Sequence, residues 1–322
     1  MGGIGVVTNP RASRNLGHPE MVGHLRRLVG GEGEVVEAES PEDLAAAAGS
    51  FRRGGVDLVA VNGGDGTSHR MLDALVGAYG RDPLPTVALL RGGAMNIVAS
   101  AHGIRGAPLR LLARLLAHRR QGRPLRTVER DLLRVEADGG PALHGFLLGT
   151  GCVVAFLEAY AAGAPSRLRA AALLLRAAGS ALSGGPFARA LSRREPMRIL
   201  ADGEEWPKPA YLAVLAGTVP ETGLGFRPLA RCDEQPGFFH AVGITARARR
   251  VALSLPAIRL GRPWHRRVAM DAVARRLVIE PEAALRFTVD GDLYLAERSL
   301  RIGVGPPVRM AIAFDRDPRS GV

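Results

Sequence analysis

Residues 57–67 read DLVAVNGGDGT, an apolar run that ends in a polar, glycine-rich loop. The run at residues 57–61 is short, apolar and partly β-branched, which is typical of a buried strand. Glycines let the loop turn tightly and let its backbone approach a ligand closely. A helix is expected from Thr67 to about Val76. A strand, a glycine loop and a helix in this order are typical of a phosphate-binding turn, where N–H groups and the helix N-terminus face the anion.

The chain around this loop alternates strand and helix patterns. Ser40, Pro41 and the acids that follow predict the start of one helix, because they supply an N-cap, a first-turn proline and first-turn carboxylates. Strands are predicted at residues 4–8, 35–38, 57–61 and 86–90, and helices at 18–29, from 41 onward, at 67–76, 96–102 and 108–120. Repeated βα units imply a doubly wound parallel sheet with helices on both faces. We assign this α/β domain to residues 1–126.

The pattern changes after the Gly-Arg-Pro sequence at residues 122–124. Strands are predicted at residues 128–136, 143–148, 211–215, 238–244, 268–270, 277–280, 285–289, 299–302 and 309–314, with helices at 168–182 and 248–255. Short strands of this kind predict a mainly antiparallel, β-sandwich-like domain over residues 127–322. Whether its last strand returns to the first domain is left open.

Composition excludes several classes of site. The 322 residues carry a formal charge of +12, and Lys208 is the single lysine among 43 basic residues. A Walker P-loop is excluded because no Gly-Lys-Ser/Thr sequence occurs. Two cysteines cannot form a disulfide framework, and the eight histidines lack metal-binding spacing. The apolar window at residues 145–164 contains glycines and Glu158, which argues against a membrane span. With no signal-peptide pattern at the start, a cytoplasmic protein is expected.

Asp65 within the glycine loop points to a metal ion. A carboxylate repels phosphate unless a cation lies between them, and Mg²⁺ prefers carboxylate and phosphate oxygens. The alternative is a tight strand–helix turn in which Asp65 is an ordinary helix cap.

Five segments, in order along the chain, resemble the superfamily of diacylglycerol kinases, sphingosine kinases and ceramide kinases. Gly63–Thr67 matches the GGDGT pentapeptide of these lipid kinases, and Asn9 with Pro10 resembles their N-P-x-x-G segment. Ser40 stands where the family often has a threonine near the nucleotide. Residues 91–96 resemble a P-x-G-T-x-N loop, and residues 290–292 resemble a late D-G-E sequence. NAD kinases share the pentapeptide but lack the late sequence in this arrangement, which favours the lipid kinases.

The resemblance implies transfer of the γ-phosphate of ATP, with Mg²⁺, to a hydroxyl of diacylglycerol, ceramide or a sphingoid base. The nucleotide would lie in a cleft between the domains, near an apolar cavity wide enough for a hydrocarbon tail. Asp65, Asp290 and Asp292 are the implied catalytic carboxylates, and Asp65 and Asp292 the metal ligands. The implied nucleotide-binding residues are Asn9, Ser40, Gly63, Gly64, Asp65, Gly66, Thr67, Gly92, Gly93, Ala94 and Asn96. We expect Asp65, Asn96, Asp290 and Asp292 to converge.

The Asp-Gly-Asp sequence at residues 290–292 has two interpretations. On a strand, alternation would point both carboxylates to one side, where they would share a cation or raise one pKa. The other interpretation is an exposed hairpin turn with two solvated acids.

Several positions depart from the family pattern. His69 and Arg70 replace an Asn-Glu pair, Arg91 and Ala94 replace a proline and a threonine, and Asp292 is one methylene shorter than glutamate. Direct phosphate contacts from Arg70 and Arg91 would compensate for the lost hydroxyl. These departures motivate two alternatives: a catalytically impaired homologue that binds nucleotide or anionic lipid, and a kinase for a soluble acceptor such as NAD.

Three stretches are rich in arginine: residues 103–130, 165–194 and 246–276 hold eight, six and nine arginines. A basic and apolar helical surface suits docking on anionic lipid, whereas the ordinary interpretation is solvated arginines. We expect residues 165–194 to make transient contact with an anionic membrane surface, which places the protein at the inner face of the membrane. Nucleic-acid binding is not expected because interleaved aromatics are lacking. A homodimer is left open.

Overall fold

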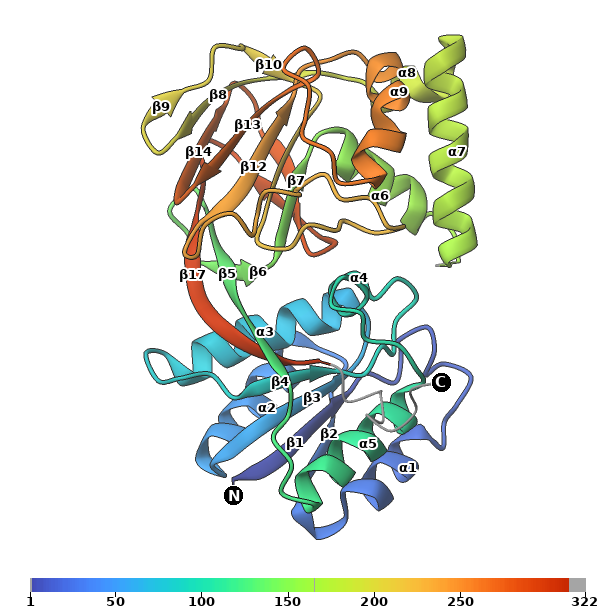
Figure 1. Ribbon diagram of the computed structural model, residues 1–322, viewed down its shortest axis with the longest axis vertical. Coiled ribbons are helices and arrows are strands. Elements are labelled where there is room, and N and C mark those ends of the chain that lie inside the picture. The colour runs from blue at the N-terminus through green and yellow to red at the C-terminus, as the bar shows by residue number, and fades with distance from the viewer. Residues whose placement is uncertain (1, 165, 313–322) are drawn as a thin grey trace. The chain divides into compact units, whose positions relative to one another are not determined.

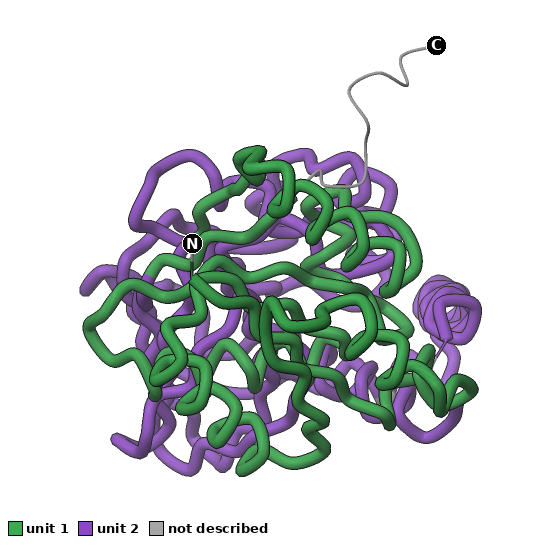
Figure 2. Tube along the Cα trace, turned by 90° about the horizontal axis from the view of Figure 1, so that it is seen from below, with its two compact units in different colours: residues 1–130, 307–322 green, residues 131–306 purple. Residues whose placement is uncertain are grey.

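The structure is a computed structural model that describes residues 2–164 and 166–312. It divides into two compact units, drawn in different colours in Figure 2. Unit 1 comprises Met1–Arg130 and a segment that begins at Pro307, and unit 2 comprises Asp131–Pro306. The division falls within strand β5 (Thr127–Ala137). Residues 313–314 of the last predicted strand lie outside the described residues.

Unit 1 contains a parallel sheet in the order β4-β3-β1-β2. Its strands are β1 (Gly3–Thr8), β2 (Gly33–Glu37), β3 (Val56–Asn62) and β4 (Thr86–Leu89). Val6 in β1 pairs with Val35 on one side and with Ala60 on the other. The final strand, β17 (Leu300–Ala311), ends parallel to β4, where Met310 pairs with Val87.

Two pairs of helices cover the faces of this sheet (Figure 1). α1 (Met21–Val29) packs against α5 (Pro108–Arg120), and α2 (Pro41–Arg53) packs against α3 (Asp65–Tyr79). A 3₁₀ turn at Gly30–Glu32 precedes β2, and the short helix α4 spans Ile97–Ala101. α2 begins with a complete capping box, in which Ser40 Oγ accepts from Asp43 N. This arrangement confirms the predicted parallel α/β domain.

Unit 2 contains a six-stranded antiparallel sheet and the antiparallel part of an eleven-stranded sheet, and the two share one apolar core. The first has the order β13-β12-β11-β7-β15-β16, with strands Ala269–Ala274, Phe239–Ile244, Ala213–Gly217, Leu147–Thr150, Leu285–Val289 and Asp292–Ala296. The second joins β17 and β5 to β6 (Leu143–Gly145), β8 (Glu195–Ala201), β9 (Glu204–Glu205), β10 (Ala210–Tyr211) and β14 (Arg276–Pro281). Val214 and Phe287 of the first sheet lie in one buried cluster with Ile199 and Leu277 of the second. The predicted mainly antiparallel β domain is therefore confirmed.

Helices α6 (Cys152–Ala161), α7 (Arg167–Ser183), α8 (Pro186–Leu191) and α9 (Ala248–Arg259) complete unit 2. α7 packs against both α8 and α9 at the edge of this unit (Figure 1). Among the described residues, no helix is long and apolar enough to cross a membrane.

Candidate active site

The candidate site of unit 1 lies at the carboxyl edge of its parallel sheet. β2 lies on one side of β1 and β3 lies on the other. The connections that leave the carboxyl ends of β1 and β3 therefore run in opposite directions across the sheet. Open α/β sheets bind ligands at such a reversal, outside the carboxyl ends of the strands. The loop after β4 reaches the same edge, because β4 is parallel to β3. All three loops carry residues singled out in the sequence.

A buried network of amides connects the first two loops. At the end of β3, Asn62 is fully buried, and its Nδ2 donates to Thr8 Oγ1 at 3.0 Å. Asn15 Nδ2 donates to the carbonyl oxygen of Asn9 at 2.7 Å, and Asn9 Nδ2 donates to Thr67 Oγ1 at 3.1 Å. Asn9 and Thr67, two of the implied nucleotide-binding residues, thus lie in hydrogen-bond contact. Asn15 was missed, because nothing in its local sequence distinguishes it from other loop asparagines.

The two glycine loops touch through their backbones. A Cβ atom at Gly93 would lie 2.3 Å from the Cα of Gly64, and one at Gly92 would lie 2.6 Å from Asn62 Oδ1. Asn62 Oδ1 is itself buried and has no hydrogen-bond partner among the described residues. A Cβ at Gly63 would lie 2.4 Å from the Cβ of Thr67. These glycines are therefore required for the packing of the loops, in addition to any approach of a ligand.

Asp65 joins the second loop to the third. It occupies the first turn of α3, whose N-cap is Gly64, and its Oδ1 accepts from the backbone N of Ile97 at 2.6 Å. Asn96 stands directly before Ile97 in a left-handed conformation, with φ of 51°. Its side chain exchanges hydrogen bonds with Gly93, accepting from N at 3.1 Å and donating to O at 2.6 Å. Asp65 thus ties two loops together.

The remaining unit 1 positions have identifiable local roles. Ser40 follows β2, and its hydroxyl caps α2. Gly66 lies in the first turn of α3, and Ala94 is half-buried in the third loop. Among the departures from the family pattern, His69 is buried in α3. Arg91 is buried with φ of 63°, and its guanidinium donates to the carbonyl oxygen of Ile104.

The Asp-Gly-Asp sequence of unit 2 forms a tight hairpin turn, so the strand interpretation was wrong. Val289 of β15 pairs with Asp292 of β16, which leaves Asp290 and Gly291 as the two turn residues, with φ of 48° and 101°. Two positive φ values define a type I′ turn, for which Asp-Gly is a preferred sequence. The preference of Asp-Gly for a type I′ turn therefore outweighs the alternating strand pattern at these residues.

The interpretation as two solvated acids was also wrong for Asp290. Its side chain is buried, 7% exposed, and Oδ1 accepts from Leu147 N at 2.9 Å while Oδ2 accepts from Phe146 N at 3.0 Å. This carboxylate holds the junction between β6 and β7. Asp292 is half-buried at the start of β16. The expected convergence of Asp65 and Asn96 with these two aspartates joins residues of different units and stays a prediction.

The donor set at Asp65 fits a magnesium ion held together with a nucleotide. Among the described residues, no group of three or more His, Cys, Asp or Glu side chains could hold a metal ion by itself. Mg²⁺ is commonly bound by one or two carboxylates, with substrate phosphates and water as the other ligands. One carboxylate at the N-terminus of α3, beside two backbone loops, matches that pattern.

Comparisons with known proteins agree with this fold. Residues 3–127 match the model of the diacylglycerol kinase catalytic domain. A solved diacylglycerol kinase from Bacillus anthracis str. Sterne is 15% identical, with 97% of each chain covered and a TM-score of 0.66. Yeast NADH kinase, solved with NADH, is 10% identical, with 97% of this chain and 84% of that chain covered and a TM-score of 0.55. At these identities the two structures show a shared fold. No curated protein matches the chain.

The matched segment contains both glycine loops, Asp65 and Asn96, and it indicates a phosphotransferase of the kinase type. Residues 3–127 thus belong to the diacylglycerol kinase catalytic domain family, which confirms the resemblance found in the sequence.

Proposed function

We propose that the protein transfers the γ-phosphate of ATP to a hydroxyl group of a membrane lipid: diacylglycerol, ceramide or a sphingoid base. The observation that carries the proposal is the position of Asp65. It lies in the first turn of α3 and is bonded to the third loop, between two glycine segments in backbone contact. Phosphoryl transfer depends mostly on positioning and on neutralising charge. A fixed carboxylate beside helix N–H groups meets both needs.

The residues of this chain would have separate roles in the reaction. Backbone N–H groups at the start of α3 would bind phosphate oxygens, helped by the positive end of the helix dipole. Asp65 and Asn96 would fix the loops around them. A bound Mg²⁺ ion would neutralise charge between Asp65 and the phosphates. Asp292 would bind the metal or the acceptor hydroxyl, and Asp290, besides serving as base, would hold the turn that positions Asp292.

An exposed apolar stripe on α7 supports an acceptor that lies in a membrane. Leu168, Leu175 and Leu182 recur every seven residues and are 84%, 74% and 47% exposed. Ala170 is the helix's only buried residue among those described. Ordinary surface helices turn their polar face outward, so an outward leucine stripe marks a site for a membrane or a partner. The surrounding residues 165–194 contain six arginines and no acid, which favours an anionic membrane.

The direct test is phosphorylation of a panel of acceptors. Purified protein with labelled ATP and Mg²⁺ is presented with diacylglycerol, ceramide and sphingosine in vesicles, and separately with NAD. We expect label in a lipid and none in NAD. Phosphorylation of NAD alone would replace this proposal with a soluble acceptor. Binding of ATP without transfer to any acceptor would indicate the impaired homologue, which the altered positions at His69 and Arg91 also favour.

The membrane part of the proposal has its own test. Leu175→Ser should lower activity on diacylglycerol in vesicles by about tenfold, because a buried leucine contributes roughly 1.5–3 kcal/mol to apolar transfer. Activity on a short-chain, water-soluble diacylglycerol should stay unchanged. Leu295→Ser on β16, where the leucine is 54% exposed, is the matched control. Equal losses with both substrates would show that α7 does not contact the membrane.

A further inference from the structure

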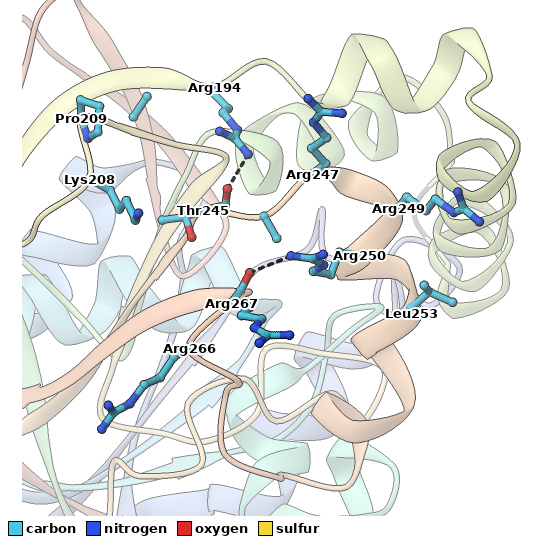
Figure 3. Close-up of a pocket in the computed structure, with 12 residues that line it drawn as sticks. Arg194, Lys208, Pro209, Thr245, Arg247, Arg249, Arg250, Leu253, Arg266 and Arg267 are labelled. Carbon is cyan, nitrogen blue, oxygen red and sulfur yellow. Dashed lines mark hydrogen bonds between the residues drawn. The ribbon is translucent and has the colours of Figure 1, made fainter.

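Unit 2 contains a second basic feature, outside the candidate active site. It is an open cavity of about 860 Å³, which we call the arginine cavity (Figure 3). Seven of its lining side chains are cationic: Arg194, Lys208, three on residues 247–250 at the start of α9, and two on residues 266–267 before β13. No lining residue carries a carboxylate. Segments far apart in the sequence therefore place their positive charges around one space.

These charges are not neutralised within the described part of the chain. Arg194 donates to the carbonyl oxygen of Thr245, and Arg250 donates to that of Arg267 at 3.4 Å. None of the seven side chains forms an ion pair among the described residues, although arginines elsewhere, such as Arg231 with Asp271, do so. Seven like charges around one cavity repel each other, and an anion bound there would relieve the repulsion.

The start of α9 adds to the positive potential. Its N-cap is Arg247, which makes no side-chain cap, and its first turn has no acidic residue. The N-terminus of a helix carries a partial positive charge that favours acids, as at α2, where Glu42 and Asp43 occupy the first turn. Arginines at 247, 249 and 250 have the unfavourable charge for this end of a helix. An anionic ligand would turn the same residues into a favourable arrangement.

We propose that the arginine cavity binds the phosphate group of an anionic phospholipid headgroup. Arginine forks suit phosphate oxygens. A lipid is favoured because Leu253 lines the cavity and is 65% exposed, and Leu260, which follows the last residue of α9, is 67% exposed. The lining contains no aromatic residue on which a nucleic-acid base could stack. That the bound phosphate belongs to a membrane lipid rests on the proposed function. The affinity of the cavity for phosphate does not require kinase activity.

Binding to vesicles without ATP separates this inference from the kinase proposal. The full chain is sedimented with vesicles of phosphatidylcholine that contain phosphatidylglycerol. The variant Arg247→Gln/Arg267→Gln removes two cavity charges, and Arg276→Gln/Arg301→Gln removes two exposed charges elsewhere in unit 2. At about 1 kcal/mol for each basic residue near an anionic surface, the cavity variant should bind about thirtyfold more weakly. The control should lose less than about threefold.

Equal losses in the two variants would overturn the site, because the attraction would then be a property of net charge. Equal binding to pure phosphatidylcholine would overturn the role of the headgroup. Two soluble probes distinguish other sources of phosphate: glycerol 3-phosphate and a single-stranded RNA oligomer. If the cavity binds either soluble probe more tightly than it binds the vesicles, the proposal is also contradicted. Circular dichroism of both variants should match the wild type, and the same vesicle result is expected whether or not lipid phosphorylation is observed.

Discussion

The carboxyl edge of the unit 1 sheet and the arginine cavity of unit 2 both suit anions, but they are built differently. The first is held by buried hydrogen bonds, such as that from Asn62 to Thr8, and by the backbone contact of Gly64 with Gly93. The second relies on exposed cationic side chains, two of which bond only to backbone carbonyls. Preorganised donors suit a reaction that needs fixed geometry. Adaptable charges suit attraction to a surface.

The largest effect is expected at Asp65, because activity in a site of fixed geometry is sensitive to the loss of a single charged side chain. Asp65→Asn keeps an oxygen that can accept from Ile97 N, but it removes the charge. Kinase activity should fall by about a hundredfold or more, because charge stabilisation is lost, while the midpoint of thermal unfolding changes little. Glu129→Gln, an exposed charge change in unit 1, is the control. Activity within a few-fold of wild type would remove Asp65 from the mechanism.

The next largest effect is expected at Asp290 of unit 2, whose buried carboxylate accepts hydrogen bonds from backbone N–H groups. Asp290→Ala leaves the N–H groups of Phe146 and Leu147 without this acceptor, at about 1–3 kcal/mol each. We expect unfolding in urea to show a loss of roughly 2–5 kcal/mol. Asp290→Asn should retain most of the stability, because asparagine keeps an acceptor and suits a type I′ turn.

The asparagine variant also separates two roles of Asp290. Since we propose that the carboxylate is a catalytic base, Asp290→Asn should be stable but inactive. If it is a positioning residue, the variant will keep most of its activity. An alanine variant as stable as wild type would show that the bonds to Phe146 and Leu147 are unimportant.

Contact between the glycine loops should be sensitive to one methyl group. Gly93→Ala would place a Cβ 2.3 Å from the Cα of Gly64, and overpacking of this kind costs about 1–3 kcal/mol. Gly77→Ala is the matched control in α3, because a Cβ there meets nothing within 4 Å. That change should stabilise the protein by up to about 1 kcal/mol. Calorimetry and ATP binding are measured for both, and equal stabilities would contradict the loop contact.

The smallest effect is expected at Asp138, an exposed counterpart of Asp290. Backbone N–H groups of Glu297, Ser299 and Arg298 hold the pKa of the Asp138 carboxyl below its ordinary value of 3.8. A lowered folded-state pKa stabilises the protein above the unfolded pKa, and the gain is lost as pH falls below about 4. The unfolding midpoint of Asp138→Asn should lie slightly below that of wild type at pH 7 and approach it near pH 3. A difference that grows with acidity would reverse this sign.

Much of unit 1 could be predicted from sequence because its elements carry local signals. Residues 57–67 identify β3, the glycine loop and the start of α3, and Ser40 with Asp43 marks the start of α2. In unit 2 the strand predicted at 143–148 is split into β6 and β7 around Phe146, whose N–H binds Asp290. Two predicted strands near the end form the single strand β17, because its ends pair with different partners, β14 and β4.

Other features escaped prediction because they depend on tertiary contacts. α6 lies in the apolar window that was considered only as a membrane span, and β8, whose buried residues alternate at Met197, Ile199 and Ala201, was missed. The arginine cavity joins Arg194 and Lys208 to residues some 40–70 positions later, so no local pattern reveals it. Likewise, Asn15 joins the buried network only through the return of the chain to the edge of the sheet.

Hydrogen–deuterium exchange tests the division between the two regions most directly. ATP with Mg²⁺ should slow exchange in residues 62–68 and 91–97 and leave the start of α9 unchanged. Vesicles containing phosphatidylglycerol should instead slow exchange at residues 247–253 and 265–268. Protection of the arginine cavity by ATP, with no change in the glycine loops, would contradict the assignment of the nucleotide to unit 1.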